Sequence, residues 1–228
     1  MAANRVILIL GAGRNIASST AQLFASKGYK VALVSRGNSH NPDPSYLHIK
    51  GDLSFPETIP SFFEQVKKAY GSPPNVVVYN AAVSNIADPT DTLALTAPQI
   101  TTDITVNYIS TYIAAQEAVR GFASVPDDAP KSFIFTGNGL NTKPLPALVS
   151  NGAGKSATAH FLEVAVTAYK DKGYTFYYAD ERKSNGDYAY SAISGPGHAE
   201  RYWDLSQDRK QQPWLHTFVT GEGYKKFH

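Results

Sequence analysis

A glycine turn near the start of the chain has residues that could bind phosphate groups. The apolar run Val6–Leu10 leads directly into Gly11-Ala12-Gly13-Arg14-Asn15-Ile16-Ala17, and a helical pattern follows. A strand, a glycine turn and a helix start direct backbone N–H groups and the helix dipole at a pyrophosphate. Gly11 permits the tight turn, Gly13 keeps side chains away from the phosphates, and Ala17 lets the helix pack closely. This context predicts a nucleotide site, and a βα turn without a ligand is the alternative interpretation.

Two arginines near this turn indicate which dinucleotide would bind. Ser35-Arg36 ends the second β-like run, where a site that prefers NAD usually has Asp or Glu for the ribose hydroxyls. Arg36 can pair with a 2′-phosphate, and Arg14 in the glycine turn could reach the same group. We therefore expect NADP(H) as the cofactor, and the alternative is that both arginines are ordinary solvated surface residues.

Three further motifs follow in an order and at a spacing that resemble the short-chain dehydrogenase/reductase superfamily. Asp52-Leu53 matches the pair that the family uses around the adenine, Tyr79-Asn80-Ala81-Ala82 matches its Asn-Asn-Ala-Gly, and Asn107 falls on its active-site Asn. The resemblance covers at least residues 5–180 and is greatest to divergent fungal members, although only the first of the family's three motif glycines is kept. It implies that the cofactor is bound by these motifs, the glycine turn and Lys155, which gives the set Gly11, Gly13, Arg14, Asn15, Ile16, Ser35, Arg36, Asp52, Leu53, Asn80, Ala81, Ala82, Asn107 and Lys155.

The catalytic Ser and Tyr of the family are absent from the matching positions. Asn138 stands at the Ser position, and the Tyr-x-x-x-Lys window begins with Asn151 and ends with Lys155. In the family, the Tyr protonates the alkoxide that forms when a hydride reaches a carbonyl, and the Lys lowers the pKa of that Tyr. An Asn amide exchanges no useful proton near neutral pH, so ketone reduction by the family mechanism is disfavoured.

The resemblance nevertheless assigns possible site roles at these positions. Asn138 and Asn151 could donate hydrogen bonds that polarise a substrate oxygen. Lys155 and Asn107 could hold the nicotinamide ribose and a proton-carrying water. Asp180 opens an Asp-Glu-Arg sequence that replaces the family's Pro-Gly pair after the sixth strand. The expected catalytic residues are therefore Asn107, Asn138, Asn151, Lys155 and Asp180.

Three functions remain open on these residues. The first is an NADP(H)-dependent reductase of a small organic carbonyl compound, with a relocated acid such as Tyr178, Tyr190 or His198. In a variant of this function, an imine or iminium substrate needs no acid, and Asp180 or Glu181 stabilises its cation. The second is non-redox chemistry such as cyclisation, isomerisation or dehydration, and the third is a catalytically inactive module that binds NADP(H). We favour the reductase.

Several of these residues also have plainer structural interpretations. Asn151 is expected to cap its helix, with substrate contact as the alternative. His198 follows a Gly-Pro-Gly sequence at a helix start and is expected to be a surface residue. Asn138 lies between two glycines, where a turn suits Asn whether or not it also contacts substrate. Asp180-Glu181-Arg182 is either a surface turn or part of the site, and its place at the carboxyl end of a central strand favours the site.

Short apolar runs that alternate with helical stretches must position these side chains. The predicted strands are Val6–Leu10, Lys30–Ser35, Tyr46–Lys50, Asn75–Tyr79, Ser132–Thr136, Tyr174–Tyr178 and one near His216–Val219, and the predicted helices are Ile16–Lys27, Pro56–Tyr70, Pro98–Phe122, Ser150–Lys172 and His198–Arg209. This alternation is typical of an α/β fold, a Rossmann-like doubly wound parallel sheet of about seven strands with helices on both faces. We expect a single domain over residues 1–228, in which residues 174–228 complete the sheet and form a divergent substrate or cap segment.

Composition excludes several other classes of protein. The chain has 228 residues, a net charge of only +2 and no long basic run, so we expect no nucleic-acid partner. The absence of Cys removes disulfides and thiolate chemistry, and the six His lack metal-ligand spacing, so no metal site is expected. The longest apolar run, Val6–Leu10, is too short to span a membrane, and no signal-peptide pattern is found, so we expect a cytoplasmic location.

The expected partners are a small-molecule substrate and further copies of the same chain. The resemblance implies a homodimer or homotetramer that pairs through the two long helices near residues 98–122 and 150–172. Small residues on these helices would permit close packing, and helices buried within one monomer have the same small residues: Ala114, Ala115, Ala118, Ala157, Ala165 and Ala168.

Overall fold

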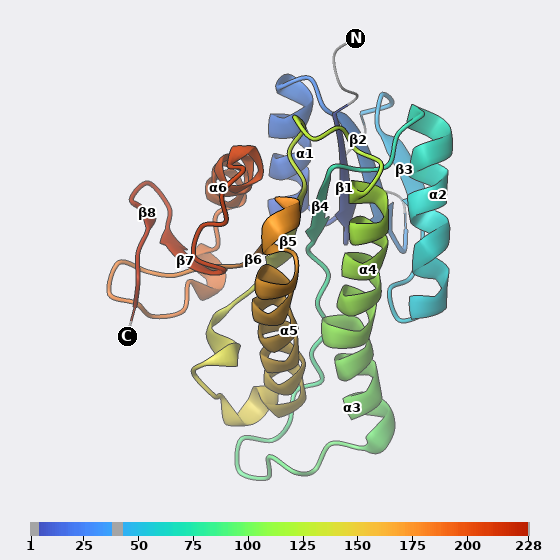
Figure 1. Ribbon diagram of the computed structural model, residues 1–228. Coiled ribbons are helices and arrows are strands. Elements are labelled where there is room, and N and C mark those ends of the chain that lie inside the picture. The colour runs from blue at the N-terminus through green and yellow to red at the C-terminus, as the bar shows by residue number, and fades with distance from the viewer. Residues whose placement is uncertain (1–4, 38–42, 228) are drawn as a thin grey trace.

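The computed structural model describes residues 5–37 and 43–227, through which one eight-stranded sheet runs (Figure 1). The strand order is β3-β2-β1-β4-β5-β6-β7-β8, and every neighbouring pair is parallel except β7–β8. The strands are β1 (Val6–Leu10), β2 (Lys30–Ser35), β3 (Leu47–Lys50), β4 (Val76–Tyr79), β5 (Ser132–Thr136), β6 (Thr175–Glu181), β7 (Leu215–Val219) and β8 (Gly223–Tyr224). All seven predicted strands are present, and the short antiparallel β8 adds one.

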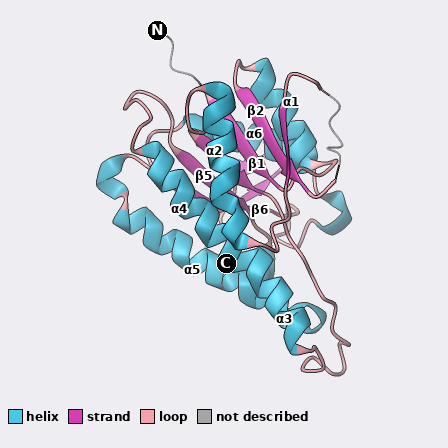
Figure 2. Cartoon of the chain, turned by 90° about the vertical axis from the view of Figure 1, so that its right-hand side faces the viewer, coloured by secondary structure: helices cyan, strands magenta, loops and turns pink. Residues whose placement is uncertain are grey.

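Helices cover both faces of the sheet, which confirms the predicted Rossmann-like α/β fold. One face carries α2 (Ile59–Tyr70), α4 (Ser110–Phe122) and α5 (Val149–Ala168), and the other carries α1 (Ile16–Ser26) and α6 (Gly195–Gln207) (Figures 1 and 2). The single helix predicted over Pro98–Phe122 is instead α3 (Ala97–Ile104), a π-helical turn (Thr105–Ile109) and α4. Within the described ranges, no helix is both long and apolar enough to cross a bilayer.

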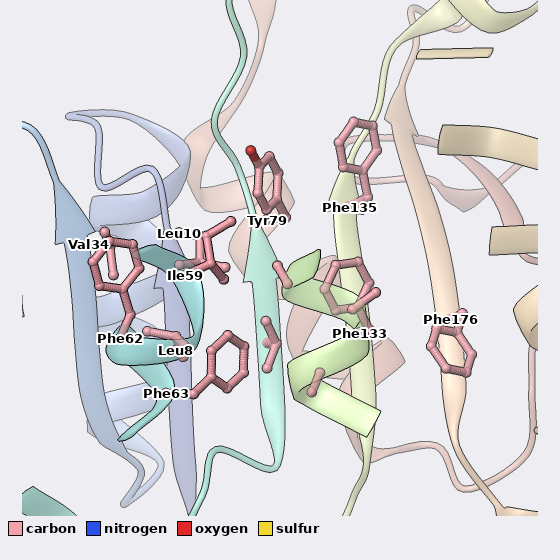
Figure 3. Packing of buried hydrophobic residues seen from close by; sticks show 14 of the residues in the cluster. Leu8, Leu10, Val34, Ile59, Phe62, Phe63, Tyr79, Phe133, Phe135 and Phe176 are labelled. Atoms are coloured by element: carbon pink, nitrogen blue, oxygen red, sulfur yellow. The ribbon is translucent and has the colours of Figure 1, made fainter. Parts of the chain in front are cut away.

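Side-chain alternation on the central strands builds a core on each face of the sheet. Along β1, Val6, Leu8 and Leu10 pack with α2, α4 and α5, whereas Ile7 and Ile9 pack with α1 and α6. Aromatic side chains of α2 and β5 fill the first of these clusters (Figure 3). Burial of each Leu or Phe stabilises the fold by about 1.5–3 kcal/mol, so the carboxyl ends of the strands are held in fixed positions.

The C-terminal quarter of the chain extends the same sheet. β6, β7 and β8 form its far edge, and α6 packs on α1 through the rings of Phe24, Tyr29 and Trp203, whose centroids lie 5.1–5.8 Å apart. β6 continues to Glu181, beyond its predicted end at Tyr178, and all of its residues are buried. The Asp-Glu sequence therefore belongs to a buried strand, and the surface-turn interpretation is wrong.

Candidate active site

A cavity of about 590 Å³ lies over the carboxyl ends of β1, β2 and β4. The strand order reverses between β1 and β4, and open α/β sheets bind ligands at that point. The cavity is lined by Gly11, Ala12, Gly13, Val34, Ser35, Arg36, Gly37, Gly51, Asp52, Leu53, Ser54, Asn80, Ala81, Ala82, Val83 and Val106. Nine of the predicted cofactor residues are in this set, and the five that do not line it are Arg14, Asn15, Ile16, Asn107 and Lys155.

The glycine turn has one closed side and one open side. Gly11 has a φ of +96°, and a Cβ on it would meet the backbone nitrogen of Ala81 at 2.5 Å. Asn80 Nδ2 also donates to the Gly11 carbonyl at 2.9 Å, which ties the turn to the end of β4. A Cβ on Gly13, in contrast, would have no atom within 4 Å. No side chain caps the start of α1 at Asn15, so N–H groups of its first turn are left for a ligand, and this geometry fits a diphosphate.

The side chains at the end of β2 include one exposed cation. Arg36 is exposed and lines the cavity, whereas Arg14 is exposed but does not line it. The Ser35 hydroxyl donates to the Gly37 carbonyl at 2.8 Å and so closes the turn after β2. Asp52 accepts a hydrogen bond from the Ser54 N–H at 2.9 Å. Within the described part of the chain, Arg36 is therefore the exposed cation of this cavity that can meet a phosphate.

Asn107 and Asn151 both hold the segment that follows β4. Asn107 Nδ2 donates to the carbonyls of Val83 at 2.7 Å and Asp103 at 2.9 Å. Asn151 Nδ2 donates to the same Val83 carbonyl at 2.8 Å and to Ser84 Oγ at 2.7 Å, and its buried Oδ1 has no partner among the described residues. Asn151 does not cap α5, which begins at Val149, so the capping prediction is wrong. The N–H groups of the Asn151 amide instead hold Val83 and Ser84 in place.

Lys155 reaches the end of β5 from α5. Its Nζ donates to the Thr136 carbonyl at 3.0 Å and lies 4.2 Å from the centre of the Phe135 ring. Burial lowers the pKa of the ammonium to about 7, and the charge of Asp180 opposes this only in part. Lys155 thus lies next to the predicted site with a proton that is readily lost near neutral pH.

A second cavity, of about 140 Å³, lies over the carboxyl ends of β5 and β6. It is mostly apolar, and its lining residues are Ile16, Thr136, Gly137, Asn138, Leu140, Leu145, Leu148, Glu181, Tyr188, Ala189, Tyr190, Ile193 and His198. Ile16 is the first residue of α1, directly after the glycine turn that lines the first cavity. A dinucleotide that lies across the N-terminus of α1 would therefore extend from the first cavity toward the second.

Asp180 and Glu181 lie in different surroundings. Asp180 is fully buried and pairs with Arg182 at 2.7 Å, while burial raises its pKa to about 6 against the effect of Arg182. It does not line the second cavity, and its charge is balanced inside the protein. Glu181 does line that cavity, and His198 Nδ1 lies 3.3 Å from its carboxylate. His198 is only 1% exposed, so the surface prediction for this residue is wrong.

The three residues suggested as a relocated acid differ in access and bonding. Tyr178 is fully buried, its hydroxyl donates to the Asn138 carbonyl at 2.7 Å, and burial strongly raises its pKa. Tyr190 is exposed and has a positive φ of 48°. Asn138, whose Oδ1 accepts from the Leu140 N–H at 3.1 Å, lines the second cavity together with Tyr190 and His198. Of the three candidate acids Tyr178, Tyr190 and His198, only Tyr190 and His198 line the second cavity.

Known proteins resemble this chain in sequence and in fold. The sequence profile described as short chain dehydrogenase matches residues 5–177. Short chain dehydrogenase/reductase dmxR12 of Cryptosporiopsis sp. (strain 8999) is 42% identical over 233 residues, which cover 97% of this chain and 94% of that protein. A metagenomic short-chain oxidoreductase in complex with NADP has a TM-score of 0.78 at 20% identity, over 95% of this chain and 96% of its own. BdcA in complex with NADPH has a TM-score of 0.75 at 16% identity, over 99% of this chain and 97% of its own.

Proposed function

The chain belongs to the short-chain dehydrogenase family, and on that premise we propose that it is an NADP(H)-dependent reductase with a non-standard active site. Its substrate is a small organic carbonyl compound, or an imine or iminium ion. The observation that carries the proposal is the first cavity, where the phosphate-binding turn Gly11–Gly13 and the exposed cation Arg36 line one space. Two proteins of the same fold are complexes with NADP and NADPH, which supports this cofactor.

Different residues would bind different parts of the cofactor. Backbone N–H groups in the first turn of α1 bind the diphosphate, and Gly13 leaves room for it beside the turn. Arg36 binds the 2′-phosphate, and Asp52 lies at the adenine. Lys155 Nζ donates to the Thr136 carbonyl and lines neither cavity, so its task is to hold the end of β5 beside the nicotinamide ribose. When bound, NADPH supplies the hydride. Glu181 and other residues of segment 174–228 form the substrate side of the second cavity.

Arg36 tests the cofactor assignment directly. We expect Arg36→Ala to weaken NADPH binding by about 10- to 100-fold, because a charge-assisted hydrogen bond contributes about 1.5–3 kcal/mol, and to leave NADH binding unchanged. The measurement is a titration of nicotinamide fluorescence with each nucleotide. Arg5→Ala is the matched control, since Arg5 is exposed before the amino end of β1, at the opposite end of the sheet. Failure of the wild type to bind NADPH would rule out the reductase.

A second candidate function rests on the hydrogen bonds of Asn151. Both of its amide donors are engaged by Val83 and Ser84, so the position of the family's catalytic Tyr performs a structural task. This favours non-redox chemistry, or an inactive NADP(H)-binding module, over a reductase that uses the family's acid. A protein that binds NADPH but does not oxidise it with any carbonyl or imine would support this alternative.

We also propose that the chain forms a homodimer or homotetramer through α4 and α5. A groove between these helices includes the exposed apolar side chains Tyr112 and Val164, and Tyr112 packs edge-on against Phe161 at 5.4 Å. We expect Val164→Asp to convert the oligomer to a monomer in sedimentation velocity, because a charge would be buried at the contact. Leu93→Asp, at an exposed apolar residue outside the groove, is the control. A monomeric wild type would contradict the proposal.

A further inference from the structure

We infer that His198, oriented by Glu181, is the proton donor of this site and serves an apolar carbonyl substrate held in the second cavity. This inference rests on the proposed reductase function. In the family, a Tyr on the helix that corresponds to α5 donates the proton, and this chain has Asn151 at that position. Here the donor would be His198 of α6, oriented by Glu181 of β6.

The hydrogen bonds of His198 determine which ring nitrogen holds a fixed proton. Nδ1 lies 2.9 Å from the Ser194 carbonyl and 3.3 Å from Glu181 Oε2. Both partners are acceptors, so Nδ1 must carry a hydrogen in every protonation state of the ring. Nε2 has no hydrogen-bond partner within residues 5–37 and 43–227, and His198 lines the second cavity. Nε2 is therefore the nitrogen that can gain and release a proton.

Neighbouring rings hold the imidazole plane in one orientation. Tyr202 of α6 and Phe218 of β7 contact it edge-on, with centroids 5.5 and 5.0 Å away. His198 is also held by its own backbone N–H, which donates to the Ser194 carbonyl at 3.0 Å. A general acid must be held in this way, because proton transfer requires a hydrogen bond of correct direction to the reacting oxygen.

Glu181 supplies a fixed negative charge beside the ring. Burial opposes ionisation of this carboxyl, but hydrogen bonds from His198, Thr220 Oγ1 and the Ser194 N–H outweigh burial and lower its pKa. An ionised Glu181 offsets the positive charge that the imidazole carries when Nε2 is protonated. Among the described residues, the other ionisable groups near the ring include Asp180, whose charge Arg182 balances, and the Tyr202 hydroxyl, which hydrogen-bonds with Thr136 Oγ1 at 2.7 Å. Tyr188 and Tyr190 line the same cavity.

The walls of the second cavity indicate the class of substrate. Leu140, Leu145, Leu148 and Ile193 supply apolar surface, and Glu181 and His198 are the charged or ionisable groups between them, apart from the tyrosines. Such a wall excludes water and favours an apolar compound over a sugar or an acid. Glu181, as an anion, also disfavours a substrate carboxylate.

The proton of the reaction comes from His198, and the hydride comes from the cofactor. The carbonyl carbon would receive its hydride from bound NADPH, which would be oxidised to NADP⁺. The π electron pair of the C=O bond moves to the oxygen, and the Nε2–H bond of His198 breaks as the new O–H bond forms. The imidazole becomes neutral, with Nδ1–H still donated to Ser194, and solvent restores the proton on Nε2. Glu181 acts on the proton transfer through His198 and is a positioning residue.

The first test uses ¹⁵N NMR of the imidazole in the whole protein without any nucleotide. We expect the neutral ring of His198 to carry its hydrogen on Nδ1. We expect Glu181→Gln to reduce the imidazolium fraction at a given pH, and Glu181→Asp to restore it in part. A neutral ring with its hydrogen on Nε2 would overturn the inference.

The second test separates this inference from the proposed function. With a panel of apolar ketones, we expect His198→Gln to bind NADPH as the wild type does but to lose about 10²- to 10³-fold in kcat, which is typical for removal of a general acid. We expect the kcat of Glu181→Gln to fall with a pH profile moved to lower pH. His160→Gln, an exposed histidine on α5, is the control.

Each remaining outcome has a definite meaning. Normal NADPH binding with full turnover by His198→Gln would overturn the assignment of His198 and leave the reductase intact. An equal loss in Tyr190→Phe with no loss in His198→Gln would assign the proton to Tyr190 instead. Failure of the wild type to bind NADPH would overturn the proposed function and this inference together.

Discussion

Replacement of Lys155 by Met is expected to stabilise the fold near neutral pH and to weaken NADPH binding. The Nζ atom lies in a fully buried position, where the loss of hydration lowers its pKa to about 7. The same amine in the unfolded chain has a pKa of about 10.4. Folding therefore carries an unfavourable contribution from this residue, and a Met of similar length removes it.

The direction of the pH dependence follows from proton binding. Between about pH 7 and pH 10.4 the unfolded chain still binds a proton that folded Lys155 has lost, so the free energy of unfolding rises with pH in this window. Well below pH 7 both states bind it, and the full unfavourable contribution, about 5 kcal/mol, is present; at pH 7 it is about 4 kcal/mol. Loss of the hydrogen bond to the Thr136 carbonyl opposes the gain by about 1–3 kcal/mol. We expect a net stabilisation of about 1–3 kcal/mol at pH 7.

Urea unfolding from neutral to alkaline pH measures this effect. The wild type should become more stable as pH rises through the window, whereas Lys155→Met should have a flatter profile. NADPH fluorescence should show affinity at least about tenfold weaker, because the hydrogen bond that holds the Thr136 carbonyl at the end of β5 is lost. Lys170→Met is the control, since Lys170 is exposed just beyond α5. A Lys155→Met protein that is less stable than the wild type at pH 7 would show that the ammonium stabilises the fold.

Substitution of the two turn glycines should have opposite consequences. Gly11→Ala places a Cβ against the Ala81 backbone in a left-handed conformation, so we expect a loss of about 2–4 kcal/mol in the free energy of unfolding. Gly13→Ala adds a methyl group to open space in the cavity, so we expect near-normal stability. The same methyl group lies where the diphosphate approaches, and we expect NADPH affinity to fall by about 10- to 100-fold.

Urea unfolding and NADPH titration of both variants distinguish these effects. Gly28→Ala is a useful comparison for Gly11→Ala, because Gly28 also has a positive φ but no atom within 4 Å of an added Cβ. Equal destabilisation at Gly11 and Gly28 would attribute the effect to backbone strain alone. Unchanged NADPH affinity in Gly13→Ala would place the cofactor elsewhere than over this turn.

The elements of the fold follow from local sequence patterns. Runs such as Val6–Leu10 and Lys30–Ser35 are almost entirely apolar, and such runs are stable as strands of a parallel sheet buried on both faces. The strand β8 is not predictable in this way, because Gly223–Tyr224 is too short to have a pattern and depends on the edge that β7 offers. The π-helical turn around Asn107 also has no signature in the local sequence, which reads as one continuous helix.

The partners of the site residues depend on distant parts of the chain. Asn151 has the residue type of a helix cap, yet its amide reaches Val83 and Ser84 because α5 begins before it and passes beside the segment after β4. Asp180 and Glu181 are adjacent in β6, and adjacent strand residues face opposite ways. The sequence therefore cannot tell which of these two neighbouring residues faces the second cavity. Only the placement of β6 shows that Glu181 faces the cavity and that Asp180, which was predicted, does not.

The sequence by itself determined the α/β fold, and it predicted a phosphate site at the glycine turn and the absence of the family's Ser and Tyr. These conclusions depend on residue identity and on hydrophobic periodicity, which are local properties. Only the tertiary structure decided that His198 is buried and meets Glu181 beside an apolar cavity. That meeting occurs because α6 folds back onto the sheet and packs on α1, and the free energy of such packing comes from contacts between segments far apart in the chain.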